Sequence, residues 1–72
     1  MLDLSHMIQD MTERNIKVTN PYSGESAMLN KEEFALYHII KGAELAEDYD
    51  TVRKGLDKFS RMNAKAYMKL LD

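Results

Sequence analysis

The densest group of side chains that could bind a metal ion lies between Glu44 and Asp50, where four carboxylates fall within seven residues. A calcium loop needs alternating oxygen ligands, a glycine at its sixth position and a glutamate at its twelfth. Counted from Asp48, those two positions hold Arg53 and Phe59, so the pattern fails. We therefore interpret these carboxylates as a solvated turn that caps helices, and we predict no metal site.

Histidines, serines and cysteines offer no catalytic pattern either. His6 and His38 lack the spacing of a zinc-binding helix motif, and no serine stands in a nucleophile elbow. The chain has no cysteine, which excludes disulfides, thiolate metal sites and a cysteine nucleophile. A chain of 72 residues also has little room for a substrate pocket. We therefore predict that the protein is not an enzyme and carries no cofactor.

An apolar spacing marks the first residues of the chain. Leu4, Ile8 and Met11 recur at i, i+4 and i+7, with Met7 beside them, which indicates one face of a short helix. Helices below about 12 residues are unstable alone, so this one must dock on its own domain or on another subunit. We predict that residues 1–14 form a peripheral or swapped helix, with these four side chains as the interface.

A small β-hairpin is the next element that the sequence predicts. Asn15–Thr19 alternates apolar and polar residues, as a half-buried strand does. Pro21 and Gly24 mark the following segment as a turn, because proline fixes φ and glycine accepts positive φ. Glu25–Leu29 would return as the second strand. Because two strands are only marginally stable alone, we expect a helix behind them.

Helices are predicted for most of the remaining chain. Asn30 as N-cap and Glu33 at N3 form a capping box that starts a helix over about Lys31–Ala46. Its Gly42 weakens that helix or permits another element to cross closely. A further helix is expected over about Thr51–Met62.

The end of the chain allows two interpretations. Either Asn63 caps a last helix, Ala64–Leu71, or one continuous helix runs from Thr51 onward. We also expect Met28, Met62 and Met68 to fill gaps in the core. The predicted apolar core is Ile16, Val18, Leu29, Phe34, Leu36, Ile40, Val52, Leu56, Phe59, Tyr67 and Leu70.

Charge is unevenly distributed along the chain. Residues 31–50 hold six acids and two bases, whereas residues 51–72 hold six bases and two acids. If the last helices are continuous, one side carries a basic surface that could bind phosphates or an acidic partner. The alternative is an ordinary solvated face, and a pI near 5.6 argues against strong nucleic-acid binding. The residues of this candidate surface are Lys54, Lys58, Arg61 and Lys65.

Three stretches carry a resemblance to a known group of proteins. Asn20–Glu25 followed by a helix, together with Tyr49–Phe59 and Ala66–Asp72, resembles short uncharacterised proteins of marine cyanobacterial phages. The resemblance covers Val18–Asp72 and leaves out the first predicted helix. Because that group has no assigned activity, it implies no site residues. It implies a phage protein made inside a bacterial host.

Together these patterns predict one α+β domain over residues 1–72, mostly helical, with an N-terminal helix, a hairpin and two or three C-terminal helices. No segment approaches the roughly 20 apolar residues of a membrane span, and the N-terminus lacks the basic start of a secretory signal, so we expect a cytoplasmic protein. The hydrophobic content of 44% is generous for so short a chain. We therefore expect a protein-interaction module that self-associates and acts on a host or phage protein. The alternative is an accessory protein that binds nucleic acid.

Overall fold

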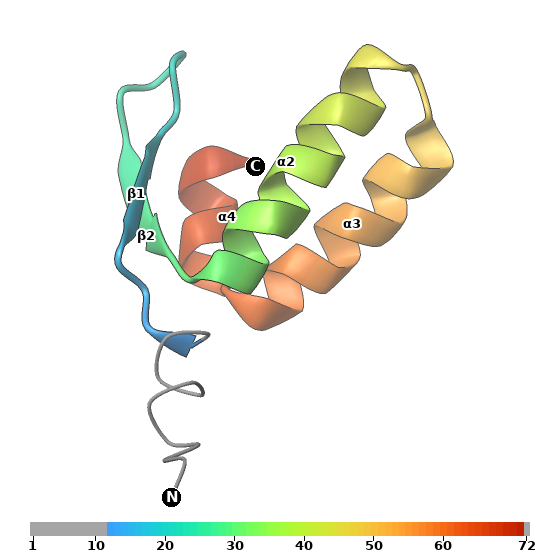
Figure 1. Cartoon of the computed structure of the whole chain (residues 1–72). Coiled ribbons are helices and arrows are strands. Elements are labelled where there is room, and N and C mark those ends of the chain that lie inside the picture. Colours follow the sequence, from blue (N-terminus) through green and yellow to red (C-terminus); the bar gives the residue numbers. More distant parts are fainter. Residues whose placement is uncertain (1–11, 72) are drawn as a thin grey trace, which may run out of the picture.

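The computed structural model describes residues 12–71 and has an α+β fold (Figure 1). Its elements, in chain order, are β1 (Ile16–Thr19), β2 (Ser26–Leu29), α2 (Lys31–Leu45), α3 (Tyr49–Met62) and α4 (Ala64–Leu70). Helices α2 and α3 lie antiparallel side by side, and α4 packs against both β2 and α3. The expected hairpin and C-terminal helices are therefore confirmed.

The expected N-terminal helix is not confirmed. Residues 1–11, which include the candidate interface residues Leu4, Met7, Ile8 and Met11, lie outside the described residues. Within the described part of the predicted helix, Glu13 and Arg14 are not helical but lead as an irregular segment into β1.

The hairpin forms because its turn satisfies its own backbone. The strands pair antiparallel, with Ile16 opposite Leu29 and Thr19 opposite Ser26. The Asn20 side chain accepts a 2.9 Å hydrogen bond from the Tyr22 N–H, while the Asn20 carbonyl accepts one of 2.8 Å from Gly24. Gly24 has a φ of 77°, a conformation that glycine adopts without strain. Local turn chemistry thus fixes the strand register.

Helix α2 begins at the predicted capping box. The Glu33 N–H donates to the Asn30 side chain at 2.7 Å, and the Asn30 N–H donates to the Glu33 carboxylate at 2.9 Å. At the other end, the N–H groups of Glu47 and Asp48 donate to the carbonyls of Glu44 and Ala43, which is a Schellman motif. Glu47 occupies its left-handed position with a φ of 58°, where glycine is the usual residue.

Asn63 separates the last two helices. Its φ of −153° and ψ of 80° break the helical path, and its side chain caps α4 by accepting a 3.2 Å hydrogen bond from the Ala66 N–H. The interpretation of two helices is therefore confirmed, and that of one continuous helix is wrong.

The core lies where α2, α3, α4 and β2 meet. Gly55 of α3 sits directly against Ile40 of α2, so close that a Cβ there would lie 2.6 Å from the Ile40 Cγ1. All the predicted core residues are buried or half-buried. Met28 and Met68 are 45% and 66% exposed, so the prediction that they fill gaps in the core is wrong. The fully assembled cluster is Leu29, Tyr37, Ile40, Ala43, Val52, Phe59, Ala66 and Leu70.

Candidate functional site

The most buried charged group in the described chain is the carboxylate of Glu33, whose residue is 1% exposed. A buried carboxylate is stable only when hydrogen bonds replace its lost hydration. Glu33 accepts hydrogen bonds from the Asn30 N–H at 2.9 Å and from the Asn63 side chain at 3.2 Å. Arg14 supplies the opposite charge, with its Nη2 3.1 Å from Oε2. Glu33 therefore joins three separate segments of the chain.

Arg14 is held by this carboxylate although 49% of its side chain is exposed. Its Nε lies 3.3 Å from both oxygens of Glu33, and its Nη2 also donates to the Met62 carbonyl at 3.0 Å. These bonds use Nε and Nη2, so both protons of Nη1 are left over. The guanidinium is thus held in one place with part of its donor capacity unused among residues 12–71.

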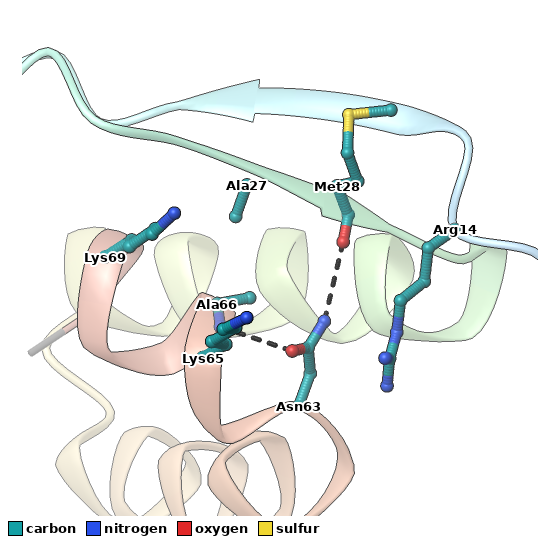
Figure 2. Close-up of a pocket in the computed structure, with 7 residues that line it drawn as sticks. All are labelled: Arg14, Ala27, Met28, Asn63, Lys65, Ala66 and Lys69. Carbon is teal, nitrogen blue, oxygen red and sulfur yellow. Dashed lines mark hydrogen bonds between the residues drawn. The ribbon is translucent and has the colours of Figure 1, made fainter.

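A pocket of about 190 Å³ lies beside this cluster, between β2 and α4 (Figure 2). The Met28 side chain points away from α4, while its carbonyl accepts a 3.5 Å hydrogen bond from Asn63. Lys65 and Lys69 stand one helical turn apart on α4, and neither forms an ion pair with another residue that the structure describes. The pocket is lined by Arg14, Ala27, Met28, Asn63, Lys65, Ala66 and Lys69.

The predicted basic surface is divided by the break at Asn63. Lys54, Lys58 and Arg61 lie on α3, whereas Lys65 lies on α4 and lines the pocket. Acids one turn earlier on α3 pair with Lys54 at 3.1 Å and with Arg61 at 3.2 Å. The prediction of this surface assumed one continuous helix, which the break at Asn63 excludes. Two of the four basic residues of the surface also have acidic partners.

The carboxylates between Glu44 and Asp50 act as caps and ion-pair partners. Asp48 caps α3, and hydrogen bonds from the Thr51 hydroxyl at 2.7 Å and from the Thr51 N–H at 3.3 Å lower the pKa of Asp48 below its usual range. Asp50 pairs with Lys54 and also with Arg53 at 3.4 Å. Residues 12–71 contain no group of three or more His, Asp or Glu side chains that could hold a metal ion.

His38 lies on the exposed surface of α2. Its ring packs edge-on against Phe34, with centroids 4.4 Å apart, and against Tyr37 at 5.8 Å. These are packing contacts with two aromatic rings and bring no nucleophile or metal ligand to the imidazole. The other histidine, His6, lies outside the described residues.

The outward face of α2 is a second feature that the sequence pattern did not identify. Ile39 and Leu45 are 55% and 89% exposed. A Cβ at Gly42 would meet nothing within 4 Å, so no other described element crosses there. We call this uncharged, exposed set the α2 outer face: Ala35, His38, Ile39, Gly42, Leu45 and Ala46.

Comparison with protein-family models, curated proteins and solved structures gives no match to this chain. The resemblance to phage proteins therefore stays a prediction. Within residues 12–71, no helix is both long and apolar enough to cross a membrane.

Of the residues that line the pocket, sequence reasoning singled out Lys65 as a basic residue and Asn63 as a cap. It missed Arg14 and Lys69. The i, i+4 spacing of Lys65 and Lys69 does place them on one face of a helix and could have been noticed. Nothing near Arg14 in the sequence indicates its contact with Glu33, 19 residues away.

Proposed function

We propose that this protein is a non-enzymatic interaction module that self-associates through the α2 outer face. The observation that carries this proposal is the exposure of Ile39 and Leu45 on a helix face whose charged residues, Lys31 and Glu32, are confined to the first turn. A helix at the surface of a monomer normally presents charged and polar residues to water. The neighbouring α3 does so, since Asp50, Asp57 and Arg61 form ion pairs along its exposed side.

A second copy of the same chain is the partner that fits this face best. Next to a two-fold axis, a charged residue would lie close to its own copy and be repelled. The middle of the α2 outer face, at Ile39 and Gly42, carries no charge and avoids this repulsion. Ala35, Ile39, Gly42 and Ala46 recur at i, i+4, i+7 and i+11, which is one stripe of a helix. In an antiparallel pair, Ile39 of one copy would pack over Gly42 of the other, where no Cβ stands in the way.

Sedimentation velocity across the micromolar range tests this proposal. The wild-type protein is expected to form a dimer that dissociates on dilution. Ile39→Glu should give a folded monomer, because it places like charges at the two-fold axis. Met68→Glu is the matched control, since Met68 is also exposed, at 66%, but lies on α4, and the dimer of this variant should persist. A monomeric wild type, or equal dissociation of both variants, would contradict the proposal.

The resemblance to phage proteins supports a further part of the proposal, in which the dimer acts on a protein in the cytoplasm of a bacterial host. Affinity capture from bacterial lysate, with and without nuclease, tests this part. One captured protein that survives nuclease is the expected result.

Nucleic-acid association is the second candidate function. It is favoured by the exposed Lys58, Lys65 and Lys69, which have no acidic partner among the described residues. Retention on DNA or RNA that falls steeply with salt would support this candidate. If the protein is still retained after charge reversal at Lys58 and Arg61, the α3 surface is not the nucleic-acid binding surface.

A further inference from the structure

We infer that the pocket between β2 and α4 binds the phosphoryl group of a phosphate monoester. This site is separate from the α2 outer face and does not depend on the proposed self-association. Its cations come from two distant parts of the chain, with Arg14 ahead of β1 and Lys65 and Lys69 on α4. The fold therefore assembles a basic site that neither segment could form alone.

Charge balance favours a dianion. Arg14, Lys65 and Lys69 bring three positive charges, and Glu33 brings one negative charge, so the group has a net charge of +2. The Glu33 oxygens accept bonds from Arg14, Asn30 and Asn63, and among the described residues Glu33 forms no ion pair with Lys65 or Lys69. A phosphate monoester carries about −1.5 to −2 at neutral pH, whereas a carboxylate carries only one charge.

Arg14 gives the site a rigid component. Free arginine side chains lose rotamer entropy when they bind an anion, which weakens binding. Here the Glu33 carboxylate and the Met62 carbonyl already hold the guanidinium, so this ordering is complete before a ligand arrives. The Arg14 Nη1 protons are the donors that this arrangement would leave for phosphate oxygens. Glu33 is a positioning residue in this arrangement.

Pocket size limits what can enter. A volume of about 190 Å³ is below the roughly 300 Å³ of pockets that enclose a whole drug-sized ligand. The pocket therefore suits a phosphoryl group with the first atoms of its ester, and the rest of the molecule lies outside. Ala27 and Ala66 provide the apolar lining that those first carbon atoms would contact.

Titration of the full chain with inorganic phosphate, followed by amide NMR at constant ionic strength, tests this inference. Saturable shifts are expected at Met28, Lys65 and Ala66, and chloride at the same ionic strength should not produce them.

A second titration compares two phosphate monoesters, O-phosphoserine and ribose 5-phosphate, which carry the same phosphoryl group on different molecules. Their relative affinities identify whether an amino-acid or a sugar ester is preferred, and affinities no higher than that of inorganic phosphate would overturn the monoester assignment.

A pair of double variants separates specific binding from general attraction. Lys65→Gln with Lys69→Gln should weaken phosphate binding roughly tenfold or more, because it removes two of the three cations that line the pocket. Lys31→Gln with Lys58→Gln makes the same change in net charge at exposed lysines outside the pocket and should change the affinity less than about twofold. Equal weakening in both double variants, or shifts that never saturate, would overturn the inference. The pocket variants should have the same sedimentation coefficient as the wild type, because the pocket lies outside the α2 outer face.

Discussion

The side chain of Asn63, at the break between α3 and α4, donates a 3.2 Å hydrogen bond to the buried carboxylate of Glu33 in the first turn of α2. The same asparagine caps α4, and the same glutamate completes the capping box of α2. Two local caps are thereby joined into one tertiary contact. This contact places the start of α2, the start of α4 and Arg14 next to one another, and so forms one wall of the basic pocket.

Removal of the Glu33 carboxylate should destabilise the fold strongly. Glu33→Ala leaves the Asn30 N–H without an acceptor and the Asn63 amide with only its 3.5 Å bond to the Met28 carbonyl, and each buried unsatisfied donor costs about 1–3 kcal/mol. We expect a loss of about 3 kcal/mol in the free energy of unfolding, measured by urea denaturation. The matched control is Glu32→Ala, an exposed glutamate in the same helical turn, which should cost about 0.5 kcal/mol. Similar losses in the two variants would mean that Glu33 acts only as a helix-terminal charge.

Glycine-to-alanine substitutions should have opposite effects in α2 and α3. Gly55→Ala forces a Cβ to within 2.6 Å of the Ile40 side chain, so overpacking should cost about 1–3 kcal/mol. Gly42→Ala meets no atom within 4 Å and should stabilise the monomer by about 0.5–1 kcal/mol, since alanine favours helix. Urea denaturation at a dilution where the protein is monomeric checks both values. A stabilising Gly55→Ala would show that Ile40 can move aside.

Local sequence signals predicted most of the fold. The Asn20–Gly24 turn, the capping box at Asn30 and the break at Asn63 were all visible, because each depends on residues within a few positions of one another. Apolar periodicity also predicted the buried core residues Leu29, Ile40, Val52, Phe59 and Leu70, but it did not include Ala66. It did not identify the exposed apolar face at Ile39, because both faces of α2 are rich in apolar residues and periodicity alone does not say which face is covered.

The basic pocket could not be predicted from the sequence. It depends on Arg14 meeting Glu33 across 19 positions and on Asn63 meeting Glu33 across 30. Charge counting alone grouped Lys65 with the α3 residues, since they are neighbours in sequence. The break at Asn63 instead turns Lys65 toward β2, and that change of direction depends on the backbone conformation of one residue.

The stability contribution of Asp48 should depend on pH. Hydrogen bonds from Thr51 lower the pKa of Asp48 in the folded state, so the charged form stabilises the fold above the ordinary aspartate pKa of about 3.9. That contribution is lost as pH falls through the lowered pKa. Asp48→Asn keeps a good N-cap but has no charge. The variant should therefore be less stable than the wild type at neutral pH, and the difference in unfolding free energy should vanish in acid. A difference that does not change with pH would mean that the carboxylate charge contributes nothing.

Conversion of Asn63 to aspartate should turn its attractive contact with Glu33 into a repulsive one. Asn63→Asp retains the oxygen that caps α4 but replaces the amide donor, 3.2 Å from the Glu33 carboxylate, with a second negative oxygen. An uncompensated buried charge costs about 3–5 kcal/mol, so we expect a loss of that size at neutral pH. Two carboxyls that share one site raise the pKa of one of them, so protonation should relieve the repulsion. The difference in unfolding free energy from the wild type should then narrow as pH falls.

Asn63→Ser is the control, because serine also caps a helix but adds no charge. Its smaller loss of about 1–3 kcal/mol should not depend on pH. If both variants lose the same stability at every pH, the amide of Asn63 contributes to the fold only through the cap of α4.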